Sequence, residues 1–552
     1  MQQTLRKRWG AYGRWSALLL AVTLLVAACG GGQDAGTGAA DGSGGAAPDG
    51  QTGQGGAGDD RIDVAVDLEY AEVMVFWDPS DSYSNEIIAM QNIYETLVRY
   101  DPATDELKPV LATSWERSDD GLTWTFHLRQ GVRFHTGKEM TSADVKGSIE
   151  RTMERGQGAS FIWAPVESIE TPDDYTVVFH LSYPAPLDLV AAAGYSAYVF
   201  DVDAADEEWF NAGHDAGTGP YTVESWSQGE QLVLTRFDDY WGGWDDPRQF
   251  EKVVYRIVPE AATRRQLMET GEGDFTYGLP PEMIEALRSQ PNLNVVETPS
   301  FQNMLGMLNT QKEPLKDVRV RRALAYAFPY QQVVDHVMQG MARTARGPIP
   351  YGMWGHGEDL PQPTYDIERA RQLLAEAGYG DGGLSLTLTY TAGDEIQRRT
   401  AELFQVELAK LGVDLEIRAM PWEQQWDLAK SPDPQQRQDI LLFYWWPDLA
   451  DPISWLMALF HSEDEILFNL SYYSNPEYDA LIEQGSQEAG LDRERAAATY
   501  IEAQRLLLDD AVALFIFDQE YVRVISDRLG GYVDNPAYPH VVRWYETYNA
   551  GR

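Results

Sequence analysis

The residues best suited to chemistry lie in one short stretch that combines aromatic rings with carboxylates. It runs from Tyr444 through Trp445 and Trp446 to Asp448, and a second carboxylate follows at Asp451. Such a stretch can project one acid and two rings into the space above it, where they could contact a ligand. The alternative is a rigid loop whose carboxylates cap turns and whose tryptophans fill a core, because aspartate is common at turns.

The elements on either side of this stretch determine where its side chains point. Residues 440–443 are a short apolar run, which predicts a buried strand. On the other side, Asp451 and Pro452 precede an apolar segment and suit the N-cap and the first position of a helix. We therefore expect the acid and the rings at the end of a strand, in the turn that leads into a helix.

Sequence patterns of common catalytic centres are missing, which favours a binding protein over an enzyme. The eight histidines form no His-Glu-x-x-His pair, and the single cysteine offers no zinc site. Gly137 and Lys138 lack the other residues of a phosphate-binding loop. Outside the Gly-rich N-terminal arm there is no Gly-x-Ser-x-Gly elbow. We expect no enzymatic activity, no cofactor and no metal, with a secreted hydrolase as a remote alternative.

The first 60 residues predict export and a lipid anchor. Basic residues precede an apolar run at 17–28, which is too short to span a bilayer and is typical of a signal peptide. The run ends in Val-Ala-Ala before Cys29, and this sequence resembles the lipobox of bacterial lipoproteins. We predict a signal peptide at 1–28, a lipidated Cys29, and a flexible Gly-rich tether at 29–60.

The chain is strongly acidic, with a formal net charge of −43. Nucleic acids and anionic lipid headgroups would repel such a surface, so neither is an expected partner. Contact with the membrane is expected only through the lipid on Cys29. The acidity suits solubility but does not identify a ligand.

Strand-like and helix-like segments alternate along the rest of the chain. Segments with every second residue apolar, such as 122–128 and 384–390, predict strands, and the spacing of apolar residues in 401–411 predicts a helix. Alternation of this kind implies crossover connections and a partly parallel sheet, so the expected fold class is α/β. Asp448 would then follow the carboxyl end of a strand, where open α/β sheets bind ligands.

Five motifs in a fixed order carry a family resemblance. In chain order, the motifs are 92–98 (NIYETLV), 109–135, 217–243, 308–327 and 445–452. Together they resemble the extracellular solute-binding proteins of the peptide, oligopeptide and nickel class of bacterial ABC importers, family 5. The resemblance runs from about residue 62 to the C-terminus.

The resemblance implies a two-lobed fold similar to type II periplasmic binding proteins, with an additional domain and a hinge crossed twice by the chain. The lobes would close over a ligand and deliver it to the permease subunits of an ABC importer. We also expect a monomer that is extracytoplasmic and held at the membrane by its lipid. The expected boundaries are 61–99, 217–304 and 515–552 for domain I, 100–216 for domain II (the additional domain), and 305–514 for domain III (the second lobe).

The resemblance also implies a role for Asp448. In peptide-binding members, the aspartate of a Trp-x-x-Asp-x-x-Asp/Glu-Pro motif neutralises the α-ammonium of the ligand. Trp445 and Asp448 match the first two positions, while Asp451 is expected to remain a helix cap. One departure leaves a question open: Leu442 stands where some oligopeptide binders carry an arginine for the ligand carboxylate.

Further ligand contacts follow from the same resemblance. Ser82, Tyr83 and Ser84 lie in a polar loop whose backbone and side-chain groups would hold the main chain of a peptide. Phe161 and Trp163 lie in a loop that lends an aromatic residue to the ligand in peptide-binding relatives. The expected ligand contacts are therefore Asp448, Trp445, Trp446, Tyr444, Tyr83, Ser82, Ser84, Phe161 and Trp163.

Other ligands and one other class of protein fit parts of the sequence. An oligosaccharide could stack on Trp422, Trp426, Trp445 and Trp446, and a nickel chelate is a third possibility on the same fold. A chaperone-like or adhesive surface lipoprotein would need no closed cleft between lobes.

Overall fold

The computed structural model describes residues 63–101, 104–204, 206–361, 364–463, 466–538 and 540–551. The predicted signal peptide, the predicted lipidation site at Cys29 and the predicted tether lie outside these residues. Among the helices in these ranges, none is both long enough and apolar enough to cross a membrane.

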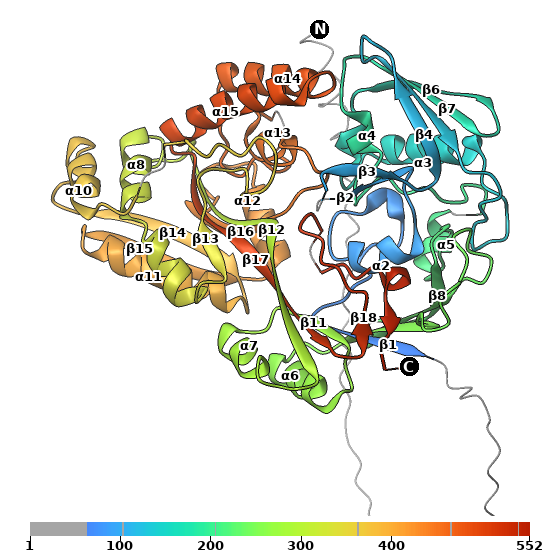
Figure 1. Cartoon of the computed structure of the whole chain (residues 1–552). Coiled ribbons are helices and arrows are strands. Elements are labelled where there is room, and N and C mark those ends of the chain that lie inside the picture. Colours follow the sequence, from blue (N-terminus) through green and yellow to red (C-terminus); the bar gives the residue numbers. More distant parts are fainter. Residues whose placement is uncertain are drawn as a thin grey trace, which may run out of the picture. The chain divides into compact units, whose positions relative to one another are not determined.

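One sheet extends through both halves of the folded chain (Figure 1). In the described residues it contains eleven strands. Ten of them follow the order β15-β14-β16-β12-β17-β11-β1-β10-β9-β8, while β13 pairs with β17. The bounds are β1 Val64–Glu69, β8 Tyr221–Ser227, β9 Gln231–Arg236, β10 Lys252–Ile257, β11 Phe275–Tyr277, β12 Leu293–Leu308, β13 Ala342–Thr344, β14 Leu384–Thr391, β15 Val413–Met420, β16 Ile440–Trp445 and β17 Ala513–Ser526.

Parallel pairs occur in both halves of this sheet. β1 runs parallel to β10 and β11, and β14 runs parallel to β15 and β16. Parallel neighbours require crossover connections, which helices supply here as expected for an α/β protein. The carboxyl ends of β1 and β16 are therefore positions of the kind where ligands bind in α/β proteins.

Two long antiparallel strands, β12 and β17, connect the two halves. Residues 293–299 of β12 pair with 520–526 of β17, and β17 pairs there with β11. After a register shift between Pro299 and Asn303, β12 pairs with β16. We call residues 63–299 and 521–551 lobe 1, and residues 303–518 lobe 2. The chain therefore crosses between lobes twice, through paired strands that suit a hinge.

Lobe 1 carries additional strands inserted between β1 and β8. They form a four-stranded antiparallel sheet, β4-β5-β7-β6, and a separate hairpin, β2-β3. Alternating apolar residues of β5 and β7, among them Phe126 and Phe179, are fully buried under α3. We keep the name domain II for residues 100–216. Its elements are β2 Val98–Asp101, β3 Glu106–Pro109, β4 Ala112–Arg117, β5 Thr123–Leu128, α3 Ser142–Arg155, β6 Val166–Asp173, β7 Thr176–Leu181, α4 Leu187–Val190 and α5 Glu207–Asn211.

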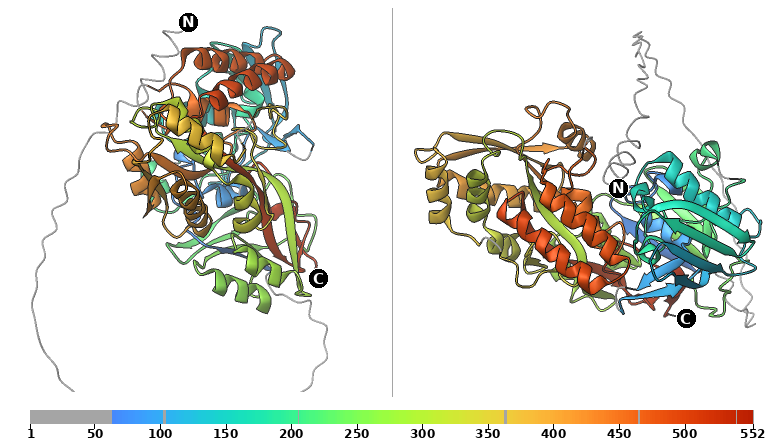
Figure 2. Two further views of the ribbon diagram at one scale, coloured as in Figure 1. Left: turned by 90° about the vertical axis from the view of Figure 1, so that its left-hand side faces the viewer. Right: turned by 90° about the horizontal axis from the view of Figure 1, so that it is seen from above.

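Helices cover the central sheet and bury its apolar side chains. One core lies in lobe 2, where Leu324, Phe404 and Leu442 are fully buried, and a smaller core in lobe 1 contains Leu68 and Met268. The helix pair α14 and α15 lies side by side in both views of Figure 2. The remaining α-helices in the described residues are α2 Ile87–Ile93, α6 Ala261–Thr270, α7 Pro281–Leu287, α8 Val318–Ala327, α9 Tyr330–Gln332, α10 Ile367–Glu376, α11 Glu395–Ala409, α12 Trp422–Ala429, α13 Ile453–Phe460, α14 Pro476–Ala489 and α15 Arg493–Asp509.

The start of α13 differs by one residue from the sequence prediction. Pro452 is the N-cap rather than the first helical residue, because the chain turns one position later than the Asp-Pro pattern suggested. Asp451 still caps the helix from outside, since its Oδ1 accepts a hydrogen bond from the backbone N–H of Ile453 at 3.0 Å.

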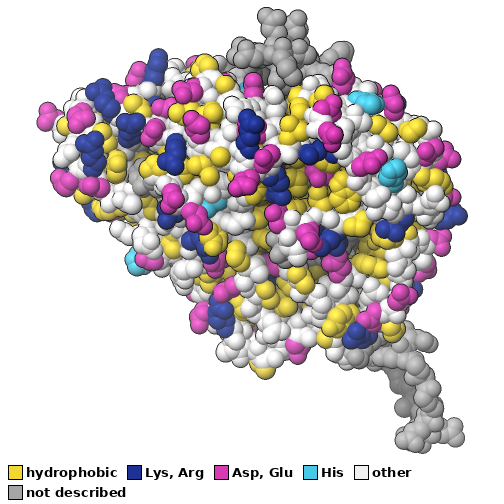
Figure 3. All heavy atoms as spheres, turned by 45° about the horizontal axis from the view of Figure 1, so that its top comes forward, with side chains coloured by type: hydrophobic (Ala, Val, Ile, Leu, Met, Phe, Trp, Pro, Cys, Tyr) yellow, Lys and Arg dark blue, Asp and Glu magenta, His cyan; other side chains and the backbone are white. Residues whose placement is uncertain are grey.

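The acidic side chains do not gather in one patch on the face shown in Figure 3. Asp and Glu lie over most of this face, with Lys and Arg between them. The negative charge of the chain is therefore spread over this face, which fits a role in solubility.

Candidate ligand-binding site

Hydrogen bonds from two sides hold the turn between β16 and α13. Trp445 Nε1 donates to the carbonyl of Ser454 at 2.6 Å. From a separate loop of lobe 2, Trp354 Nε1 donates to the carbonyl of Ala450 at 2.9 Å. These bonds fix the path of the turn, and with it the position from which Asp448 projects.

Asp448 is a half-buried acid with an unused hydrogen-bonding atom. Its Oδ2 is buried and has no hydrogen-bond partner in the described part of the chain. Burial raises the pKa of Asp448 to about 7. An ionised carboxylate is costly to bury without a partner, and a cationic group of a ligand would supply that partner.

Asp451 lies three residues further on and has a structural task. Burial raises its pKa to about 7 as well, and its Oδ2 also lacks a partner among the described residues. Its Oδ1, however, is engaged in capping α13. Of the two acids, Asp448 is thus the one without a role in the turn itself.

A tyrosine from lobe 1 meets this turn. Trp446 Nε1 donates to the hydroxyl of Tyr195 at 3.2 Å, and that hydroxyl donates to the carbonyl of Ser84 at 3.0 Å. Burial raises the pKa of Tyr195 well above its ordinary value, and the negative charges of Glu86 and Asp448 raise it further. Trp446 and Ser84 therefore meet at Tyr195, across the boundary between the lobes, and Asp448 lies near enough for its charge to act on this tyrosine.

The loop that contains Ser82, Tyr83 and Ser84 is held by its own contacts. The Ser82 hydroxyl is buried and accepts a hydrogen bond from the Ser196 backbone N–H at 3.2 Å. The backbone N–H groups of Tyr83 and Ser84 donate to Glu86 Oε1 at 2.6 and 2.8 Å. Glu86 Oε2 is buried without a partner among the described residues, and burial raises the pKa of Glu86 to about 7.

Aromatic rings from both lobes meet close to the same turn. Phe468 of lobe 2 is the common member: its ring centroid lies 5.5 Å from Trp445, 5.7 Å from Trp426 and 6.3 Å from Phe161. Phe161 comes from domain II. Trp422 extends the cluster, 5.2 Å from Trp426. The arrangement forms an apolar wall beside Trp445.

Two of the predicted contacts, Trp163 and Tyr444, lie against other protein groups, and a third, Tyr83, is exposed. Trp163 is buried in the core of domain II, where its ring stacks on Phe179 and its Nε1 donates to the Ser196 carbonyl at 2.8 Å. Burial raises the pKa of Tyr444 well above its ordinary value, and the negative charge of nearby Asp394 raises it further. Tyr83 is exposed, with its ring 5.1 Å from that of Phe76.

Tyr195 and Glu86 are site residues that the sequence did not single out. Each lies in lobe 1, about 250 or more residues along the chain from Trp446 or Asp448. Their side chains reach the turn only through the folding of the whole molecule. No local pattern distinguishes them from an ordinary buried tyrosine and an ordinary turn-capping glutamate.

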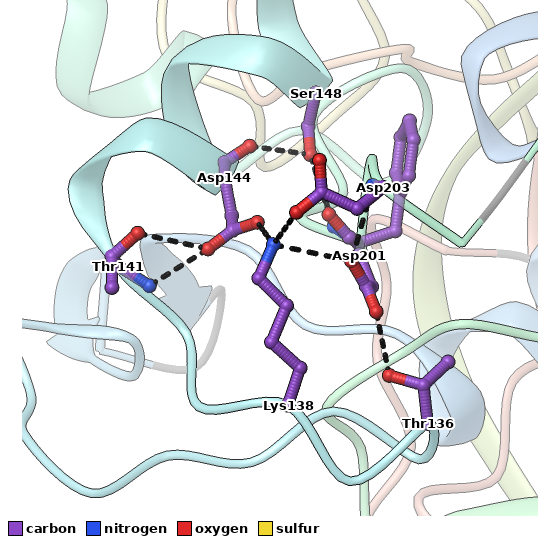
Figure 4. A network of polar contacts seen from close by, with 8 residues as sticks. Thr136, Lys138, Thr141, Asp144, Ser148, Asp201 and Asp203 are labelled. Atoms are coloured by element: carbon purple, nitrogen blue, oxygen red, sulfur yellow. Dashed lines mark hydrogen bonds and ion pairs between the residues drawn. The ribbon is translucent and has the colours of Figure 1, made fainter.

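One group of three carboxylates has the spacing of a metal site, in the part of the chain that the structure describes. It consists of Asp144, Asp201 and Asp203 in domain II. Figure 4 shows the Lys138 ammonium among them, 2.5 Å from Asp144 Oδ1 and 2.6 Å from Asp203 Oδ2. Although burial lowers the pKa of Lys138, these hydrogen bonds raise it above its ordinary value. The ammonium therefore takes the place that a metal cation would have.

The two lobes, the crossing strands and the half-buried Asp448 near the lobe boundary fit the class of proteins that bind a solute between two lobes. The chain belongs to the bacterial extracellular solute-binding proteins, family 5: the description of the matching family is "Bacterial extracellular solute-binding proteins, family 5 Middle", and the match covers residues 106–465. The family and the two-lobed α/β fold predicted from the sequence are thus confirmed.

Two curated relatives and one solved structure illustrate the similarity. The chain is 31% identical over 459 residues to "Probable D,D-dipeptide-binding periplasmic protein DdpA" of Escherichia coli, covering 81% of this chain and 87% of the relative. It is 29% identical over 476 residues to "Heme-binding protein A" of Haemophilus influenzae, covering 81% and 85%. The ABC transporter-associated periplasmic binding protein DppA from Helicobacter pylori, solved in complex with peptide STSA, matches with a TM-score of 0.78 and 27% identity, covering 88% of this chain and 98% of that chain.

Proposed function

We propose that this protein is the extracytoplasmic substrate-binding component of an ABC importer, that it captures peptides between its lobes, and that it delivers them to the permease. The observation that carries the ligand class is Asp448, a half-buried residue whose buried Oδ2 has no partner among the described residues, near the boundary between the lobes. Similarity to a D,D-dipeptide-binding relative and to a protein solved with a peptide supports this choice.

Asp448 would bind the free amino group of the peptide. An α-ammonium carries three N–H donors, and a charge-assisted hydrogen bond to Asp448 Oδ2 would give this buried oxygen its missing partner. Trp445, Trp446 and Phe161 would pack against the ligand, and the loop with Ser82, Tyr83 and Ser84 would face it from lobe 1. Recognition of the amino terminus permits many different side chains, because it involves only groups that every peptide has.

The same fold leaves other solutes as candidates. The Trp422–Trp426 pair favours an oligosaccharide as the second candidate, because paired rings can stack on sugars. A nickel chelate is the third, and the heme-binding relative shows that ligands of similar proteins differ widely. These solutes therefore belong in the same binding experiment.

We further propose that the mature protein is a monomer tethered to the membrane. Cys29 would carry the lipid after removal of residues 1–28, and the Gly-rich segment to residue 60 would let the lobes move freely outside the membrane. Labelling of growing cells with a fatty-acid analogue should mark the protein, and a Cys29→Ala variant should lose the label. Equal labelling of both forms would exclude the anchor.

Isothermal titration tests the ligand and the role of Asp448 together. The titrants are L-alanyl-L-alanine, D-alanyl-D-alanine, trialanine, cello-oligosaccharides and Ni²⁺. We expect a peptide to bind, and Asp448→Asn to weaken it by about 2–5 kcal/mol, which is roughly 30-fold or more. Asp433→Asn is the matched control, since Asp433 is an exposed, turn-capping aspartate of the same lobe. Unchanged affinity of the Asp448 variant would remove this residue from the site.

A further inference from the structure

The loop between α14 and α15, in lobe 2, touches domain II through hydrogen bonds that run in both directions. Arg117 of domain II donates to the carbonyl of Gly490 in this loop. Arg493, the first residue of α15, donates to Asp105 of domain II, with 3.2 Å from Nη2 to Oδ1. Each side therefore supplies one guanidinium to the other. We call these residues, together with their neighbours Gly121, Ala185 and Leu491, the α14–α15 contact.

Gly490 lets the two backbones approach more closely than any other residue would allow. A Cβ at this position would lie 2.4 Å from the backbone nitrogen and 2.7 Å from the Cα of Ala185 in domain II. The backbone of Gly490 is itself ordinary, with φ −66° and ψ −15°, which every residue type adopts readily. The absence of a side chain is therefore required by domain II and not by the local turn.

The opposite side of the contact has a similar close approach. A Cβ at Gly121 of domain II would lie 2.8 Å from Leu491 Cδ2. Gly121 also has φ +69°, so its own turn favours glycine as well. Gly490 is consequently the better position for a test, because a substitution there changes the contact without straining the loop.

The α14–α15 contact does not resemble a domain core. It borders a partly open hollow of about 330 Å³ whose walls come from domain II and from lobe 2. Four side chains of these walls are charged: Asp105, Arg117, Asp188 and Arg493. Interfaces between domains are more polar than domain cores, and domains joined by such interfaces are expected to move relative to one another.

The contact lies near the candidate site but is formed by other residues. The charges of Arg493 and Asp188 influence the pKa of Asp451, three residues from Asp448. The walls of the hollow and the surroundings of Tyr195 have no residue in common. Changes at Gly490 therefore alter the approach of the lobes without altering the groups that would touch a ligand.

We propose that the α14–α15 contact is a latch that stabilises the closed arrangement of the lobes and thereby sets the affinity for solute. This rests on the proposed function, in which the lobes close around a ligand. If only the closed form binds tightly, the apparent dissociation constant rises in proportion as the closed population falls. Arg117, Gly490 and Arg493 are then affinity-determining residues that never contact the solute.

The decisive experiment measures the distance between the lobes without any ligand. In the full chain with Cys29→Ser, spin labels are attached at Asp174→Cys in domain II and Glu368→Cys in lobe 2, both exposed positions. Pulsed electron spin resonance then gives the distance distribution. We expect Gly490→Ala to shift the distribution toward longer distances. Arg117→Ala, which removes a hydrogen bond and adds no bulk, should shift it in the same direction.

Gly380→Ala is the matched control, because a Cβ there would approach only Ala375 of the same lobe, at 3.1 Å. It should leave the distances unchanged. Thermal unfolding of the ligand-free Gly490→Ala variant should match the parent, since the variant only separates the lobes. Identical distance distributions in Gly490→Ala and the parent would overturn the latch. A clear loss of thermal stability at unchanged distances would also overturn it, by showing that the contact is a fixed part of the fold.

Titration with the peptide that binds the parent best completes the test. We expect the apparent dissociation constant of Gly490→Ala to rise about tenfold, with Asp448 intact. The distance measurement requires no ligand, so a failed latch leaves the Asp448 proposal standing. Conversely, a failed Asp448 test does not change the outcome of the distance measurement.

Discussion

Replacing Asp448 by asparagine should stabilise the ligand-free protein, and the gain should depend on pH. Burial raises the pKa of Asp448 from its ordinary 3.8 to about 7. Below about pH 4 the carboxyl group is protonated in both the folded and the unfolded chain, and it contributes no difference. Between pH 4 and 7 the unfolded chain releases this proton while the folded chain retains it, so the free energy of unfolding falls as the pH rises.

The expected magnitude follows from the rise in pKa, which corresponds to on the order of 4 kcal/mol above pH 7. Asparagine has no charge to bury, so the difference in the free energy of unfolding between Asp448→Asn and the parent should grow from near zero at pH 4 to a plateau above pH 7. Urea denaturation of ligand-free protein at pH 4 to 8.5 measures it. Asp433→Asn, at an exposed aspartate, should show no such trend.

Two outcomes of this denaturation series would refute the argument. If Asp448→Asn destabilised the protein at every pH, the carboxylate would have a structural partner in the fold. If the difference were independent of pH, Asp448 would titrate normally and would therefore face water. The predicted outcome instead describes a residue that costs stability in the empty protein and becomes useful only when a cation binds.

Three further predictions concern the site and domain II. Peptide affinity should rise from pH 5 to about 7, because Asp448 ionises over this range. The affinity should fall above about pH 8, because the peptide amine loses its proton. A constant affinity in titrations across this pH range would contradict the prediction. Trp446→Phe removes the hydrogen bond to Tyr195 and should weaken peptide binding by about 1 kcal/mol in the same titration, whereas unchanged affinity would deny the bond a role in closure. Lys138→Met should lower the free energy of unfolding by about 2 kcal/mol in urea and leave peptide affinity unchanged, because it removes the ion-pair partner of Asp144 and Asp201, which are not among the proposed ligand contacts.

Local sequence patterns predicted those features that depend on neighbouring residues. The apolar run before Tyr444 predicted β16, and the aromatic–acid pattern predicted that Asp448 follows the end of a strand. The Asp451-Pro452 pair predicted the start of α13 to within one residue. These features depend on alternation, capping and proline geometry, which act over a few residues.

Contacts between lobes could not be predicted in this way. Phe161 and Trp163 belong to the same short helix Ser160–Trp163, yet one ring meets Phe468 of the other lobe while the other is buried in domain II. The sequence alone gives no reason to separate them, because the difference arises from how domain II packs. Tyr195 was missed for the same reason, since its partner Trp446 lies in the other lobe.

The most direct test of the account is a crystal structure of the protein with the peptide that binds best in titration. We predict that the ammonium nitrogen of the peptide lies 2.7–2.9 Å from Asp448 Oδ2, between Trp446 and the loop that contains Ser84. A peptide bound elsewhere, or an Asp448 side chain directed to solvent or bonded only to protein groups, would contradict the central claim.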